Sequence, residues 1–246
     1  MIERPYYRIF RPNKHSDEAL YILDKNYCKE RIDLIRYYNF LQKQVVEVFN
    51  YIEPTKDTLE TYSFKNYQLL GNICMEVENN LKGILRANGY GIKEEDNWNM
   101  TDYKKINQYM KLSEYRIVLN NYNIDEFRPF EEFEKSKKPE WYQCYNSIKH
   151  NRTICISQAS LKNVLYALGG LNVLLRAQFG IYYDIANDKE DSLIWLQVQN
   201  GVYNSQNAVS IFKIIQEPKW HDSEYYDFDW NELKNSDEKF CKLSIK

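Results

Sequence analysis

The sequence has 246 residues and a formal net charge of −2 at pH 7. A chain of this length can bury a substantial core, and its near-neutral charge excludes a globally basic protein that coats nucleic-acid duplexes, so any RNA contact has to be local. The first residues lack the apolar stretch of a secretory signal, and no apolar run is long enough to span a membrane. We therefore expect a cytoplasmic protein with no membrane partner.

The five cysteines are far apart in the chain, with no Cys-x-x-Cys pair and no nearby histidine at a spacing that suits zinc. They are typical of reduced thiols in a cytoplasmic protein. A glycine-rich phosphate loop and a dinucleotide fingerprint are also missing from the sequence, so we predict neither a metal site nor a cofactor. The low content of glycine (8) and proline (6) favours a mainly α-helical fold.

Residues 1–27 mix short apolar runs with turn formers, which predicts an N-terminal arm or one or two short strands. Helical periodicity begins after this segment. Apolar residues recur at spacings of three and four over residues 28–52 and again over residues 58–87, so each segment is expected to form a long amphipathic helix. Gly71 and Gly83 interrupt the second helix, each at a cost of about 1 kcal/mol relative to alanine unless a neighbouring helix needs the room.

Residues 88–140 are less regular. We expect a short helix over residues 102–112, capped by Thr101 or by the first residue of that helix, and a strand over residues 115–119, which are rich in β-branched side chains. Residues 120–139 combine turn formers with aromatic side chains, which indicates a loop held in place by its aromatic rings.

Pro139 is well placed to open a helix that carries residues 141–152. This helix continues or bends into the most apolar segment of the chain, residues 154–179, which Gly180 ends. Because that segment is apolar around most of its circumference, several neighbouring elements have to bury it.

The C-terminal extension, residues 181–246, has a different character. Residues 192–199 and 202–215 flank an Asn-Gly turn and fit a β-hairpin loosely. Residues 220–230 form an acidic and aromatic tail, which either packs on the bundle or docks on a protein partner; we favour the first. Acidic residues repel nucleic acid, so this tail is not expected to bind RNA.

The most informative segment is the octapeptide Tyr145-Asn146-Ser147-Ile148-Lys149-His150-Asn151-Arg152. An imidazole exchanges protons at neutral pH, and neighbouring cations can hold a phosphate beside it, a combination that points to RNA chemistry. In this interpretation His150 is the proton donor or acceptor and Asn146 is its hydrogen-bonded orienter, while Lys149 and Arg152 bind phosphate. The alternative is that Asn146 and His150 are an ordinary polar pair on one face of a helix.

Helical geometry divides this segment into two faces. At about 100° per residue, Tyr142, Asn146 and His150 form one polar strip with Lys149 at its flank, whereas Arg152 falls on a second stripe. On an unbent helix Lys149 is therefore the cation nearer to Asn146. A bend before Ile154 could bring Arg152, which has the better bidentate fork for phosphate, to the same place.

The motif resembles that of the HEPN superfamily of helical-bundle domains, in which an arginine is followed four to six residues later by a histidine, often as R-N-x-x-x-H near the start of a late helix. Tyr-Asn-Ser-Ile-Lys-His matches this form at Asn146 and His150, and the resemblance covers residues 28–180. It implies a mainly α, antiparallel helical bundle with small β additions at the termini. Tyr145 occupies the position of the family's arginine, so Lys149 or Arg152 would have to replace it.

The resemblance also implies the function. Family members with an intact motif are metal-independent endoribonucleases that form dimers, so we expect RNA and a second copy of this chain as partners, in stress response, antiviral defence or a toxin–antitoxin system. Members that have lost the motif serve as non-catalytic interaction or dimerisation modules, which is the alternative. A third possibility is a small-molecule or nucleotide pocket closed by the aromatic loop at residues 127–133.

Glu78 and Lys82, on the second long helix, are candidate supporting residues. Their spacing suits a solvated i, i+4 ion pair, which is worth only ~0.3–0.5 kcal/mol. The other interpretation places Glu78 beside His150, where its charge would raise the pKa of the imidazole.

Overall fold

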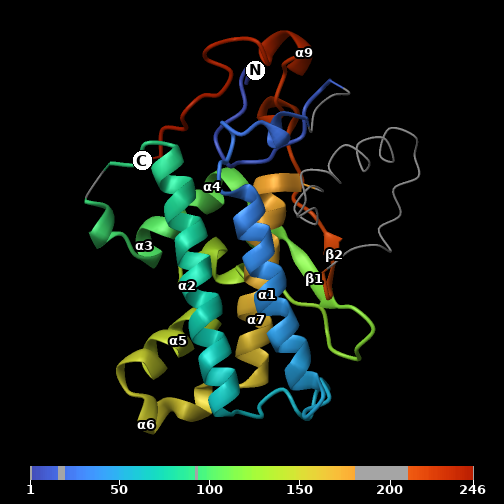
Figure 1. Ribbon diagram of the computed structural model, residues 1–246, viewed down its shortest axis with the longest axis vertical. Helices are drawn as coiled ribbons and strands as arrows, with labels where there is room; N and C mark the ends of the chain where they lie inside the picture. Colours follow the sequence, from blue (N-terminus) through green and yellow to red (C-terminus); the bar gives the residue numbers. More distant parts are fainter. Residues whose placement is uncertain (1, 16–19, 92–93, 181–209, 246) are drawn as a thin grey trace.

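The computed structural model describes residues 2–15, 20–91, 94–180 and 210–245. Within these ranges the chain is mainly helical, with one small antiparallel sheet of two strands (Figure 1). No helix among them is both long and apolar enough to span a bilayer.

The two long helices predicted in the first third of the chain are present but shorter than expected. Helix α1 spans Arg31–Phe49 and helix α2 spans Phe64–Ala87. The start of α2 was predicted six residues too early, because Ser63 adopts an extended conformation and its hydroxyl oxygen accepts the N–H of Asn66 as a helix cap. Gly89, with a φ of 72°, follows its end.

The motif helix and the apolar helix are separate elements. Helix α5 spans Glu140–His150, the single turn α6 spans Arg152–Cys155, and helix α7 spans Leu161–Phe179. The predicted start of the apolar helix at residue 154 is wrong. Ser160 caps α7, and the backbone N–H of Leu161 donates to the carbonyl oxygen of Thr61, which joins the start of α7 to the segment before α2.

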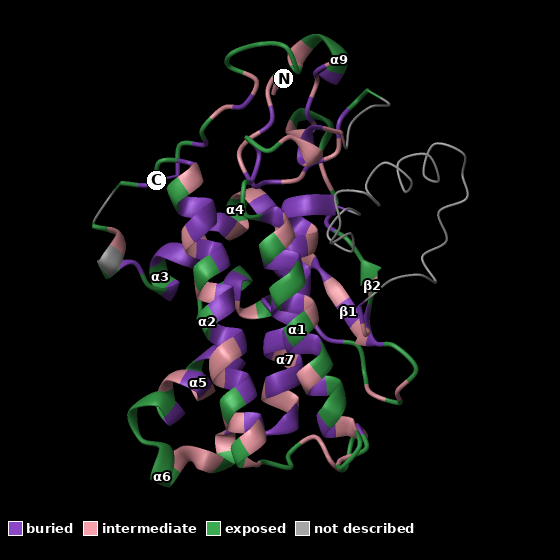
Figure 2. Ribbon diagram, viewed as in Figure 1, coloured by how far each residue is buried: buried purple, intermediate pink, exposed green. Residues whose placement is uncertain are grey.

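Helices α1 and α2 run in opposite directions, but the antiparallel packing expected for the whole bundle is wrong for α2 and α7. Lys65, at the start of α2, forms an ion pair of 3.6 Å with Glu47, near the end of α1. Helices α2 and α7, in contrast, are parallel, because they begin side by side and the Gln178 amide of α7 donates to Asn80 near the other end of α2 (3.1 Å). Figure 2 shows the buried faces of α1, α2 and α7 turned toward one another.

Two adjacent glycines of α7 allow close packing within the chain. A Cβ atom at Gly169 would lie 2.6 Å from the side chain of Ile117, and one at Gly170 would lie 3.2 Å from the ring of Trp141. A strand and α5 therefore approach the backbone of α7 at these positions.

The small sheet joins distant parts of the sequence. Strand β1 (Arg116–Leu119) pairs antiparallel with strand β2 (Phe212–Gln216), with Leu119 opposite Phe212. Strand β1 was predicted at this place. In the expected C-terminal hairpin, residues 192–199 and 202–209 lie outside the described residues, and β2, at the end of the second predicted strand, pairs with β1.

The irregular middle of the chain holds several short helices. The expected helix over residues 102–112 is divided into α3 (Met100–Tyr103), a 3₁₀ turn and α4 (Asn107–Met110), and its cap is Asn99, whose side chain accepts the N–H of Thr101. Another short helix, α9, lies near the C-terminus (Trp230–Leu233). The 3₁₀ helices span Leu20–Leu23, Glu95–Asn97, Lys104–Ile106, Leu112–Glu114, Glu131–Lys135, Ile156–Gln158 and Asp222–Glu224.

The N-terminal arm and the acidic, aromatic tail pack on each other at the end of the bundle opposite α6 (Figure 1). In its described residues the arm forms isolated bridges, such as Ile2 with Tyr226, and not the strands that we considered. Three of the tail's rings, Tyr226, Phe228 and Trp230, are buried, and the first two pack edge-on against Tyr21. A protein partner of the tail would therefore contact its acidic side chains and not these rings.

Candidate functional site

Helix α5 presents one buried and one exposed face. Trp141 is buried and its indole N–H donates to the carbonyl oxygen of Pro129 (2.8 Å), and Tyr145 and Ile148 are buried on the same face. Lys149 and His150, in the last turn, are exposed. The helix ends there because Asn151 leaves the helical region (φ −146°, ψ 68°), so the single unbroken helix over residues 141–152 was a wrong prediction.

A hydrogen bond joins the first half of α5 to α2. The hydroxyl of Tyr142 donates to the carboxylate of Glu78 (2.7 Å). Burial and then this bond raise the pKa of Tyr142 well above its ordinary value, while the nearby Asn146 amide acts in the opposite direction. Because Tyr142 precedes His150 by eight residues, about 12 Å along the helix, Glu78 lies at the other end of α5 from His150.

Lys149 lies on the side of α5 that faces α2. Its ammonium nitrogen is 5.6 Å from the centroid of the Tyr145 ring, within the range of a cation–π interaction. Burial, followed by the charge of Glu78, raises the pKa of Tyr145 to about 12, so this ring remains a neutral phenol at physiological pH. The structure thus brings Lys149 close to the ring of Tyr145.

Arg152 reaches the same side from beyond the break at Asn151. Its guanidinium carbon is 6.0 Å from the centroid of the Phe64 ring and 5.9 Å from that of Tyr67, both in the first turn of α2. On the unbent helix that we expected, the two cations would lie on different stripes. In the structure both contact aromatic rings along the junction of α2 with α5 and α6. In the described part of the chain neither cation forms an ion pair with a carboxylate.

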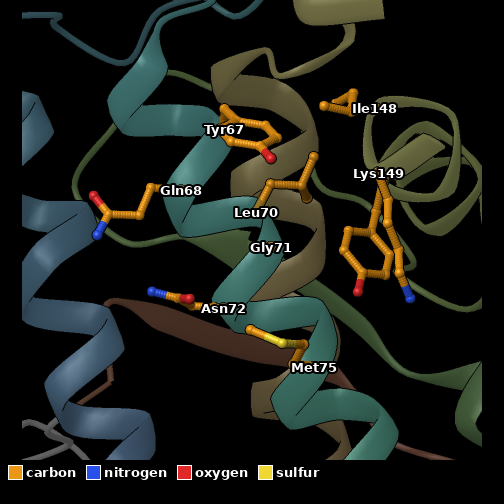
Figure 3. A pocket seen from close by; sticks show the side chains of 9 residues that line it. Tyr67, Gln68, Leu70, Gly71, Asn72, Met75, Ile148 and Lys149 are labelled. Carbon is orange, nitrogen blue, oxygen red and sulfur yellow. The ribbon is translucent and has the colours of Figure 1, made fainter. Parts of the chain in front are cut away.

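A groove runs between α2 and α5 beside these rings. Its volume is about 360 Å³. Helix α5 contributes Tyr145, Ile148 and Lys149, and α2 contributes Tyr67, Gln68, Leu70, Gly71, Asn72 and Met75. Figure 3 shows Lys149 on one side of the groove and the α2 residues on the other, with Gly71 leaving the backbone uncovered between Tyr67 and Met75.

The polar strip of the motif lies outside this groove. Neither Asn146 nor His150 lines it, and among the described residues no hydrogen bond joins the two side chains. Asn146 lies beside the hydroxyl of Tyr142, while the exposed His150 ends the helix. Lys149 therefore lines the groove while His150 lies outside it, and Arg152 follows in α6.

Lys82 lies away from the motif. It is one turn beyond Glu78 on α2, near Glu95, whose carboxyl has a lowered pKa chiefly because of the Arg86 guanidinium and to a lesser extent because of Lys82. The structure does not bring Lys82 to α5.

The aromatic loop packs into the core. Phe127 stacks on Tyr166 with ring centroids 4.2 Å apart, and the buried Phe130 packs edge-on against Trp141. These rings fill the space beside the two glycines of α7.

The residues that α2 contributes to the site were not predicted from the sequence. Phe64, Gly71 and Met75 lie at spacings of seven and four residues and therefore share one helix face. Two of them are large apolar residues that remain exposed, 73% for Phe64 and 53% for Met75. Apolar residues on the solvent side of an amphipathic helix are the signal that could have identified this surface.

No protein-family model, curated protein or solved structure matches the chain. Among the described residues there is also no group of three or more His, Cys, Asp or Glu side chains placed to hold a metal ion.

Proposed function

We propose that the chain is a HEPN-like RNA-binding protein and that it contacts RNA where α2 meets α5 and α6. The observation that supports this function best is the convergence of Lys149 and Arg152, two cations without carboxylate partners in the described residues, on the aromatic rings of Tyr145, Phe64 and Tyr67. Proteins that bind single-stranded nucleic acid combine cations for the backbone with aromatic rings for the bases.

The catalytic part of the proposal concerns His150. An exposed imidazole beside two phosphate-binding cations can remove the proton of a ribose 2′-hydroxyl or return a proton to the departing 5′-oxygen, and this chemistry requires no metal ion. In the homodimer that the family resemblance implies, two copies of His150 would divide these tasks. The cytoplasmic location follows from the sequence expectation, and a role in stress response, antiviral defence or a toxin–antitoxin system follows from the resemblance alone.

RNA binding is tested by fluorescence anisotropy with a labelled single-stranded RNA across a salt series. We expect Lys149→Ala and Arg152→Ala each to weaken binding and to reduce the slope of log K against log salt by about 0.7, the value for one phosphate contact on a single strand. Lys43→Ala and Arg36→Ala are matched controls, because both cations are exposed on α1. Slopes equal to the parent's for both site variants would contradict the proposal.

A second candidate function is a non-catalytic interaction or dimerisation module. The observation that favours it is the exposure of apolar side chains at the same end of the bundle, 73% for Phe64 and 76% for Ile154. If this surface joins two copies of the chain, Ile154→Asp should convert a dimer to a monomer in light scattering after size exclusion. A parent that is monomeric at every concentration would exclude self-association through this surface.

A further inference from the structure

Gly71 differs from the other glycines within the described long helices. A Cβ atom at Gly83 would lie 2.0 Å from the guanidinium of Arg8, and those at Gly169 and Gly170 would meet Ile117 and Trp141. These three glycines make room for a neighbour. A Cβ atom at Gly71 would meet nothing within 4 Å, although glycine in a helix interior lowers stability. No packing contact in the described part of the chain accounts for Gly71, and a glycine there allows close approach of a ligand to the backbone.

The space above Gly71 suits a flat, partly apolar ligand. The groove's volume, about 360 Å³, is at the lower end of the ~300–1,000 Å³ typical of small-molecule pockets. Leu70 and Ile148 give it apolar walls, and Tyr67 offers a partly exposed ring for stacking.

Polar groups border the same space. Gln68 and Asn72 line it on the side away from α5, and among the described residues their side-chain amides have no hydrogen-bond partner (Figure 3). An amide offers both a donor and an acceptor, which is what the edge of a nucleobase requires. Lys149 lines the opposite side, and Arg152 lies over Tyr67, so positive charge adjoins the groove where a phosphate attached to such a base would lie.

We propose that this groove holds one unpaired nucleobase of an RNA strand, stacked on Tyr67 over the bare backbone of Gly71, with an adjacent phosphate held by Lys149 and Arg152. This inference rests on the RNA-binding function proposed above and adds to it a pocket for one base. A base inside a duplex is stacked on its neighbours and cannot enter the groove, so the protein selects single-stranded RNA.

The decisive variant is Gly71→Leu, which fills the groove from its base, and Asn79→Leu is its matched control, because Asn79 is exposed on α2 outside the groove. Anisotropy is measured with three labelled probes: a short single-stranded RNA, the same strand annealed to its complement, and the same strand with abasic sites. The parent and Asn79→Leu should bind the intact single strand about tenfold more tightly than the other two probes, and Gly71→Leu should lose this preference while keeping the parent's salt dependence.

The outcomes separate the inference from the function on which it rests. If Gly71→Leu keeps the parent's preference while Lys149→Ala weakens binding, the base pocket is refuted and RNA binding stands. If the parent binds none of the three probes, the function itself fails. Should Gly71→Leu not fold, as judged by circular dichroism, Tyr67→Ala decides, because it removes the stacking ring and should reduce the preference for the intact strand at least fivefold; an unchanged preference refutes the pocket.

Discussion

Replacing Gly71 by alanine should stabilise the protein, whereas the same change at Gly169 should destabilise it. Gly71 lies inside α2, and its new methyl group would meet nothing within 4 Å. The gain is then the intrinsic difference in helix propensity, about 1 kcal/mol, which raises the melting temperature of a chain of this size by roughly 2–4 °C.

At Gly169 the same gain in propensity is opposed by a clash. The methyl group would lie 2.6 Å from the side chain of Ile117 and 3.0 Å from the ring of Phe127, which is stacked on Tyr166. Overpacking of this kind costs about 1–3 kcal/mol, so the net effect is a loss of stability.

The measurement is thermal unfolding followed by circular dichroism at 222 nm, with the two variants compared at equal protein concentration. The reasoning is refuted if Gly71→Ala melts below the parent, because another part of the molecule would then have to occupy the space that the structure leaves open above Gly71. It is also refuted if Gly169→Ala melts above the parent.

Three further predictions concern titratable side chains. His150→Ala should abolish cleavage of single-stranded RNA in EDTA and leave the melting temperature within a few degrees, because His150 is exposed. The control His15→Ala should change neither cleavage nor melting temperature. Persistent cleavage by His150→Ala would remove His150 from the mechanism. Tyr142→Phe should lower the free energy of unfolding by about 1 kcal/mol in urea denaturation through loss of the bond to Glu78, and unchanged stability would contradict that bond. Burial raises the pKa of the Glu76 carboxyl, so the folded state binds this proton more tightly than the unfolded state does. Stability should therefore fall as the pH rises from the ordinary carboxyl range to this raised pKa. In Glu76→Gln the plot of stability against pH should lack this part of the decline, and identical profiles for parent and variant would contradict the reasoning.

The long helices were predictable because burial repeats along them. In α1 and α2 apolar side chains at spacings of three and four face the core, as the pattern indicated. The pattern gave a wrong helix start where the apolar periodicity extends beyond the end of the helix itself. Ile154 reads as the first apolar position of α7, yet it is 76% exposed, because Ser160 caps the helix six residues later.

The site was only half predictable for a related reason. The motif on α5 is contiguous in the sequence, so its residues could be recognised together. Their partners on α2, Phe64 and Tyr67, are more than 80 residues away, and only the break at Asn151 brings Arg152 to them. No local pattern specifies a change of chain direction at an exposed asparagine.

The break at Asn151 also bears on the two proposed roles of the motif, RNA binding by the cations and catalysis by His150. On a continuous helix Lys149 would flank the strip that holds His150, and Arg152 would lie on a second stripe. With the helix ended at His150, Arg152 turns to α2 and Lys149 lies over Tyr145, while the imidazole occupies the adjoining exposed face. Changes in the groove should therefore alter RNA affinity, and changes at His150 should alter only the rate of the chemical step. Under the proposed function, a chain that lost the chemistry at His150 would keep its surface for RNA intact.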